Sequence, residues 1–153
     1  MPTAVMYRVM EQVQTQIRAL ALTDMTSANV VIKWKPRQLR VAVDPLPAIQ
    51  ICPAPMPEPM PQDLANSDKV HYPVLISIQA VQNKDYDANI ERNLLWREKI
   101  NREFRYQNLD NAISEIIHCL PMPKSIFDVQ AWEENLWRSD FVMLFVSREL
   151  RGN

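Results

Sequence analysis

The feature that most restricts the fold of this chain is its glycine content. Its 153 residues include one glycine, Gly152, next to the C-terminal residue. Phosphate-binding loops, dinucleotide-binding turns and nucleophile elbows use glycine where the backbone takes a positive φ or closely approaches a ligand. Since no internal position offers that residue, the sequence excludes the standard nucleotide-binding and dinucleotide-binding enzymes.

The length and the charge balance set further limits. A chain of this length predicts one domain, residues 1–153. Hydrophobic residues make up 47% of it, enough for a core that needs no metal or disulfide support. The formal net charge is −1, which argues against a protein whose affinity depends on neutralising many phosphates.

Cysteine content and hydropathy bear on the compartment. Cys52 and Cys119 are too few for a disulfide framework, and we interpret them as reduced thiols of the core. The N-terminal residues lack the basic segment of a signal peptide, and the apolar runs are far shorter than the roughly 20 residues of a membrane span. We therefore expect no membrane partner and a reducing, aqueous compartment.

The first fifty residues predict a helix followed by strands. Apolar residues recur at three- and four-residue steps over residues 3–22, as in an amphipathic helix. Alternation of apolar and polar residues predicts a strand at 30–35, a short second strand at 39–43 and a resumed strand at 48–52. In this interpretation Trp34 lies on the same side as Val30 and Ile32.

Proline stands at every second position from residue 53 to residue 61, namely at Pro53, Pro55, Pro57, Pro59 and Pro61. Each proline fixes its own φ, disfavours helix in its predecessor and supplies no N–H, so the segment cannot pair as a central strand. Together with residues 62–69 it predicts a long extended loop that projects from the domain at 53–69. We interpret the five prolines as a docking segment for a neighbouring protein; the alternative is a solvated excursion.

The second half predicts a strand at 72–80, a helix that ends near residue 106, and a closing strand at 141–146 that is covered on both faces. Residues 109–120 fit either a short helix or a turn followed by a strand from 113, and a helical turn is expected near 129–134. Residues 147–153 read as a charged tail. The side chains expected to face inward from the longer helix are Ile90, Leu94, Leu95, Ile100 and Phe104.

The order of these elements predicts an α+β fold. It has a mixed, mainly antiparallel sheet of about four to five strands, packed by two main helices, with the long proline-rich loop outside. Two helices cannot cover both faces of a wide sheet, so we expect one face to be left for a subunit partner.

The sequence contains no arrangement that predicts catalysis, a cofactor or a bound metal. His71 and His118 with Cys52 and Cys119 make a nominal set of zinc ligands, but no pair has the spacing of a zinc motif. Scattered carboxylates such as Glu133 and Glu134 are better explained as a solvated face. We therefore predict a protein that is not an enzyme and that uses no cofactor.

The second helix carries a basic surface with an aromatic residue. Its members are Arg92, Trp96, Arg97, Lys99, Arg102 and Arg105. They represent either a solvated helix face or a surface that pairs with carboxylates of a neighbouring subunit, for which the planar guanidinium is well suited. We take Trp96, Arg97 and Arg102 as candidate interface residues, together with the five prolines.

The order of elements resembles the tail-terminator and neck proteins of long-tailed bacteriophages. The resemblance covers the helix at 7–22, the strands at 47–53 and 70–78, the segment Leu94-Leu95-Trp96-Arg97, and the closing strand that ends at 146–151. It implies a structural virion protein, usually of six copies, that forms a ring, terminates the tail tube and joins it to the head connector. It implies no catalytic residues.

The resemblance also implies partners and a location. The partners are further copies of the chain, the tail tube protein, the connector or stopper protein, and the tail sheath where one exists; DNA would only pass through the ring. The location is the virion neck, after assembly in the host cytoplasm. The alternatives are another neck component, such as a stopper or an adaptor, and a small nucleic-acid-processing enzyme. A third is an adaptor that binds a proline-recognising partner through residues 53–61.

Overall fold

A computed structural model describes residues 4–55, 62–64, 67–82, 88–122 and 125–150 of the chain. Within these residues the elements are α1 (Val5–Ala19), η1 (Ser27–Asn29), β1 (Val30–Ile32), β2 (Ala48–Pro53), β3 (Gln62–Leu64), β4 (Ser67–Val81), α2 (Ala88–Phe104), η2 (Leu109–Asn111), β5 (Ile116–Met122), α3 (Val129–Glu133) and β6 (Leu136–Leu150).

The sheet has the strand order β1-β2-β4-β6-β5, and β3 pairs with β4 off this path. β1 and β2 are parallel, whereas the other pairs are antiparallel. β4 and β6 pair along their whole lengths of 15 residues each. β5 pairs with β6 only at residues 142–147, so in the described part of the chain residues 136–141 lie at the border of the sheet.

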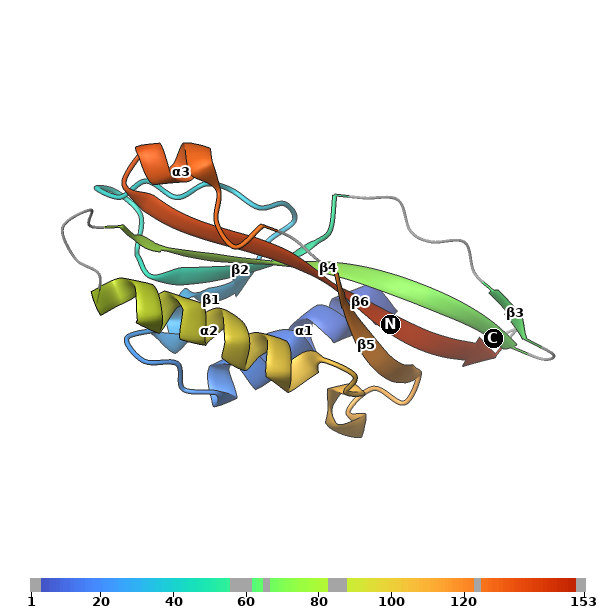
Figure 1. Ribbon diagram of the computed structural model, residues 1–153. Helices are drawn as coiled ribbons and strands as arrows, with labels where there is room; N and C mark the ends of the chain where they lie inside the picture. Colours follow the sequence, from blue (N-terminus) through green and yellow to red (C-terminus); the bar gives the residue numbers. More distant parts are fainter. Residues whose placement is uncertain (1–3, 56–61, 65–66, 83–87, 123–124, 151–153) are drawn as a thin grey trace.

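α1 and α2 lie side by side across one face of the sheet (Figure 1). Gln16 of α1 donates a hydrogen bond to Glu103 of α2 at 3.0 Å, and Trp96 of α2 donates from Nε1 to the carbonyl of Thr23 at 2.9 Å. The distal ends of β4 and β6, with β3, project beyond this helical layer, and α3 lies beside the N-terminal part of β6 (Figure 1). The fold therefore combines a two-layer body with a projecting strand arm.

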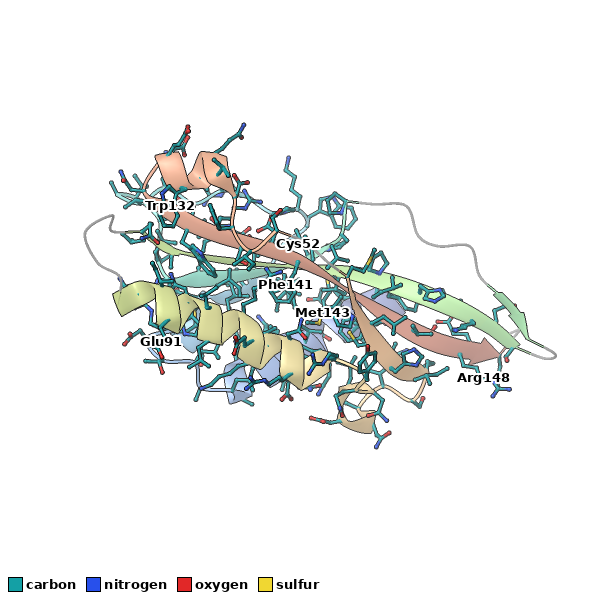
Figure 2. All side chains as sticks on the ribbon, in the orientation of Figure 1. Cys52, Glu91, Trp132, Phe141, Met143 and Arg148 are labelled. Carbon is teal, nitrogen blue, oxygen red and sulfur yellow. The ribbon has the colours of Figure 1, made fainter. Side chains whose placement is uncertain are left out.

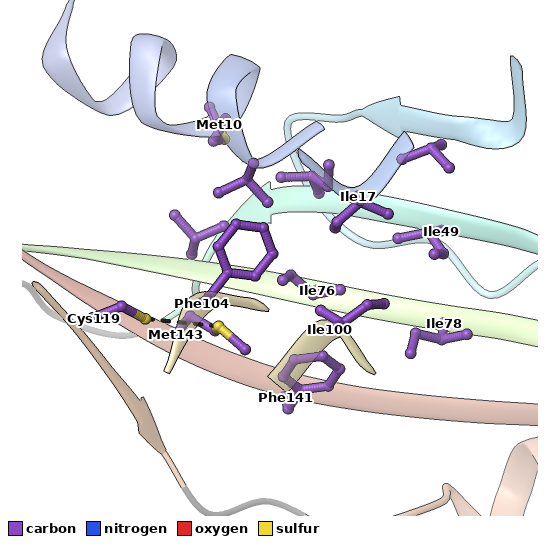
Figure 3. Close-up of a cluster of buried hydrophobic side chains, with 14 of the residues drawn as sticks. Met10, Ile17, Ile49, Ile76, Ile78, Ile100, Phe104, Cys119, Phe141 and Met143 are labelled. Atoms are coloured by element: carbon purple, nitrogen blue, oxygen red, sulfur yellow. Dashed lines mark hydrogen bonds between the residues drawn. The ribbon is translucent and has the colours of Figure 1, made fainter. Parts of the chain in front are cut away.

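The main core lies between the two helices and the sheet, as Figure 3 shows. α1 contributes Val9, Val13 and Ile17, each less than 2% exposed. Phe104 of α2 meets Phe145 of β6 edge to face, with ring centroids 6.1 Å apart. Full burial of each such side chain contributes about 1.5–3 kcal/mol, so this layer supplies the main driving force for the fold.

The predicted α+β class is confirmed, with a mixed and mainly antiparallel sheet. The strands at 48–52 and 72–80, the turn followed by a strand after residue 109 and the helical turn near 129–134 are all present. The prediction of a strand at 39–43 is wrong, because these residues form turns that cross the sheet instead of pairing with it. Residues 67–69 and 147–150 belong to strands, not to a loop and a tail, since β4 and β6 extend each other by mutual pairing.

The predicted inward face of α2 is also partly wrong. Ile90 and Leu95 are each 40% exposed, whereas Trp96 is 1% exposed and Asn93 is buried. The true inward stripe follows Asn93, Trp96, Ile100 and Phe104, which are spaced three and four residues apart. The tryptophan takes the central inward position because it is the largest apolar side chain on the helix and its N–H reaches the carbonyl of Thr23.

The scarcity of glycine is visible in the turns. Ala21, Asp24, Tyr106 and Asn135 have φ values of 48, 61, 59 and 62°, in the left-handed region where glycine is usual. Aspartate and asparagine tolerate this region comparatively well, but alanine and tyrosine do not. The chain therefore stores backbone strain at turns that most proteins make with glycine.

Candidate functional site

The sheet face opposite the helices carries a hydrogen-bonded polar network that attaches a long loop. Gln79 accepts from the backbone N–H of Leu39 at 2.8 Å and donates to the carbonyl of Arg37 at 2.9 Å. Gln50 accepts from the N–H of Arg37 at 2.8 Å and donates to the same carbonyl at 3.1 Å. Residues 36–44 therefore cross this face and cover part of the surface that was expected to be open.

The network continues across β4 and β6. Ser77 donates to Asp140 at 2.6 Å, and Gln79 donates to Ser77 at 3.2 Å. Arg138 binds both carboxylate oxygens of Asp140, at 3.2 and 3.0 Å. Because each buried polar group in this row has a partner, the arrangement is typical of a structural network.

The loop is also fixed at its far end by Asp44. Its carboxylate accepts from the backbone N–H of Arg40 at 2.7 Å and from the side chain of Arg37 at 2.9 Å. The hydrogen bond from the Arg40 backbone is the main cause of a lowered pKa of Asp44, and Arg37 lowers it further. This carboxylate therefore remains ionised and holds the loop closed on itself.

A groove lies between this loop and β1 at one edge of the sheet. Its volume is about 480 Å³, and its walls include Val31, Trp34, Leu39 and Pro45. Trp34 follows the end of β1 and is 85% exposed, flanked by the exposed Lys33 and Lys35. We call Lys33, Trp34, Lys35 and the groove beside them the Trp34 edge.

The other border of the sheet, beside the first half of β6, carries acidic residues where the Trp34 edge carries lysines. Ile126, Phe127 and Val129 are exposed around the start of α3, and Phe127 lies against Trp132 with ring centroids 5.4 Å apart. Residues 125–135 contain the carboxylates of Asp128, Glu133 and Glu134 and no basic residue. Their backbone is attached to the border of the sheet by a hydrogen bond from the N–H of Asp128 to the carbonyl of Arg138 at 2.8 Å. We call residues 125–135 the α3 edge.

The proline candidates fall partly outside the described residues. Pro53 ends β2 and is half-buried, and Pro55 is exposed. Pro57, Pro59 and Pro61 lie outside the described residues, so their part in a docking segment stays a prediction.

The candidates on α2 differ in their surroundings. Trp96 belongs to the core, as described above, and Figure 2 shows the side chains of this layer. Arg97 packs over the ring of Phe141 at 4.8 Å and donates to Ser139 at 2.6 Å, and burial lowers its pKa. Arg102 is exposed and pairs with Glu98 at 3.4 Å. The structure therefore leaves Arg102, among these three, on the open surface.

The histidines and cysteines do not converge. Cys119 faces the helices, with its sulfur 3.7 Å from that of Met143, whereas Cys52 faces the opposite side with Leu75 and Val142 (Figures 2 and 3). Burial raises the pKa of Cys119 to about 12 and that of Cys52 to about 11. Burial also lowers the pKa of His71, with smaller effects from Lys69 and His118. The described residues contain no group of three or more histidine, cysteine or acidic side chains placed to hold a metal ion.

None of the described helices has both the length and the apolar character needed to cross a membrane.

With this geometry in place, the chain can be compared with known proteins. No protein-family model matches the sequence, and no curated protein matches it either. Among solved structures, the chain is similar to a chain of the virion of a native gene transfer agent particle, with a TM-score of 0.62 and 12% identity. The match covers 95% of this chain and 99% of the other. At this identity the two chains share a fold, over nearly their full lengths.

The Trp34 edge is the feature that sequence reasoning missed. The alternation Val30, Ile32, Trp34 placed the tryptophan inside, but β1 ends at Ile32. The available signal was local: Trp34 stands between Lys33 and Lys35, and Pro36 follows directly after Lys35. Lysine is rarely buried and a strand seldom continues through a proline, so the two flanking lysines and Pro36 together indicate a solvated tryptophan.

Proposed function

We propose that this chain is a structural protein of the neck of a long-tailed phage or phage-like particle. In this proposal, copies of the single domain 1–153 form a ring, of six copies as is usual in the tail-terminator and neck family, that terminates the tail tube and joins it to the head connector. The observation that carries the proposal is the fold shared with a gene transfer agent virion chain over 95% of this chain and 99% of that one.

The architecture supports a role in assembly. The projecting ends of β4 and β6 offer strand surface beyond the helical layer, where a neighbouring chain can pair or pack. Asp44 and the network around Gln79 hold the loop rigidly, and rigid surfaces lose little conformational entropy when they dock. A rigid body with exposed edges is well suited to repeated contacts in a ring.

The proposed partners follow from the same role. They are further copies of the chain, the tail tube protein, the connector or stopper protein and, in a contractile particle, the sheath; DNA passes through the ring without being read. The proline segment at 53–61 and the exposed Arg102 are proposed contacts to these neighbours. We propose no catalytic activity and no cofactor.

Tail tubes grown in vitro test this function. The purified chain is added while the tail tube protein of the same particle polymerises, and tube lengths are measured by electron microscopy. The proposal predicts shorter tubes as the added protein increases, with gold-labelled chain at tube ends. Unchanged lengths together with label absent from the ends, for protein whose circular dichroism shows it to be folded, would refute it.

A further inference from the structure

The Trp34 edge is a basic surface whose two lysines are not paired with carboxylates in the described part of the chain. In the described part of the chain, neither Lys33 nor Lys35 takes part in an ion pair, whereas the adjacent Arg37 is paired with Asp44 at 2.9 Å. Trp34 rises between these two lysines beside the groove of about 480 Å³. An exposed tryptophan next to an apolar groove is typical of an anchor at a protein interface.

The α3 edge is complementary to it in chemistry. It presents exposed apolar side chains at Ile126, Phe127 and Val129, with carboxylates at Glu133 and Glu134. Glu134 accepts a hydrogen bond from Gln38, but no cation pairs with Glu133 within the described residues. These apolar side chains are suited to the groove beside Trp34, and the carboxylates are suited to pair with Lys33 and Lys35.

The two edges lie at different borders of the sheet. β1 forms one border, and residues 136–141 of β6, with the α3 edge beside them, lie at the other, with β2 and β4 between them. The loop at 36–44 spans this distance, and its Gln38 reaches Glu134. Two complementary surfaces on opposite sides of one chain form the arrangement that gives a head-to-tail contact between copies.

We propose that the Trp34 edge of one copy binds the α3 edge of a second copy. In this contact Phe127 and its apolar neighbours of the second copy seat in the groove beside Trp34. Glu133 and Glu134 of that copy then face Lys33 and Lys35. This inference rests on the proposed ring and names the surfaces that form it.

Charge favours this pairing over the symmetric alternatives. A two-fold contact between two Trp34 edges would bring lysines against lysines, and one between two α3 edges would bring carboxylates together; both are costly at an interface. A head-to-tail contact repeats without leaving an unmatched surface, and it closes into a ring when the rotation between copies allows.

The test is a charge exchange, read by sedimentation velocity. One variant carries Lys33→Glu and Lys35→Glu, and the other carries Glu133→Lys and Glu134→Lys. Each variant alone should self-associate at least about tenfold more weakly than the wild type, because like charges then face each other. An equimolar mixture should recover association, since the two altered edges complement each other, as do the two unaltered ones.

A matched control places the same kind of change elsewhere. Glu11→Lys with Glu91→Lys alters one exposed carboxylate on each of α1 and α2, outside both edges, and should leave association within about twofold of the wild type. Thermal melts verify that every variant is folded. Trp34→Ala removes the apolar anchor without changing the charge of the edge, and it should weaken association at least about tenfold.

Three results would overturn the inference: wild-type association in either reversed variant, no recovery in the mixture, or a wild-type protein that stays monomeric to about 1 mM. Adding the same samples to growing tail tubes separates this failure from failure of the proposed function. If the reversed variants still shorten tubes, the contact is wrong and the function stands. If the wild type does not shorten tubes, the function itself is wrong.

Discussion

At the scale of single residues, the fold depends on non-glycine residues in conformations that favour glycine. Ala21 follows the end of α1 with φ of 48°, the position where a helix usually ends on glycine. The strain of an alanine there is about 1–2 kcal/mol, and glycine removes it at an entropic cost of about 0.4–1 kcal/mol in the unfolded chain.

Ala21→Gly should therefore raise the free energy of unfolding, by about 0.5–1 kcal/mol. The matched control is Ala19→Gly, which puts the same residue inside the last turn of α1 and should lower it by about 0.5–1 kcal/mol. Urea titrations measure both. Equal destabilisation by the two substitutions would show that Ala21 is not strained.

The two thiols give a residue-scale prediction in pH. Burial raises the pKa of Cys119 to about 12 and that of Cys52 to about 11, so both stay protonated in the folded chain at pH 8. A thiol reagent at pH 8 should label the native protein only through unfolding, and label both cysteines at once in denaturant.

The same shifts fix the sign of a stability change. Unfolded thiols ionise near pH 8.5, below their folded pKa values, so the contribution of Cys119 is present below that pH and is lost as the pH rises toward 12. Stability should fall less steeply from pH 8.5 to 10.5 in Cys119→Ala than in the wild type. Parallel pH profiles, or fast labelling of the native protein, would contradict the burial argument.

At the scale of elements, the loop at 36–44 shows how a segment without strand pairing is held in place. Gln79→Ala removes the acceptor for the N–H of Leu39 and the donor to the carbonyl of Arg37, and should cost about 1–3 kcal/mol. Hydrogen exchange at Leu39 should accelerate strongly. In Gln38→Ala, which changes the same residue type on the exposed side of the loop, stability should stay within about 0.5 kcal/mol and exchange at Leu39 should be unaffected. Similar effects of the two substitutions would mean that Gln79 does not fix the loop.

Elements also show what the sequence could predict. Strong periodicity located α1, β2 and the middle of β4, because a buried face imposes its spacing on the residues that form it. The alternation at 39–43 wrongly predicted a strand, since Leu39 is buried because its loop crosses the sheet face, not because it belongs to a strand. The inward face of α2 was misassigned because its basic residues are not all solvated: Arg97 packs on Phe141 while Leu95 is exposed. Which side of a helix or loop packs against the sheet depends on tertiary contacts, and the local sequence pattern does not reveal these contacts.

At the scale of the whole molecule, the sequence predicted an α+β body and the structure adds the positions of its edges. The basic Trp34 edge and the acidic α3 edge lie apart because of the strand order, which places β1 and the first half of β6 at opposite borders of the sheet. No local pattern predicts that order, so the Trp34 edge and the α3 edge could not be paired from the sequence. The order is what turns two ordinary surface patches into a head-to-tail arrangement.

The native mass of the wild-type protein over a concentration series decides whether copies of the chain form a closed ring. We expect one discrete assembly that grows at the expense of the monomer, at six times the chain mass of 17.8 kDa, with no larger species. Its abundance should fall as salt is added, because the exposed lysines and carboxylates are screened. A monomer at every concentration, or an open series of masses without an upper limit, would contradict the closed ring.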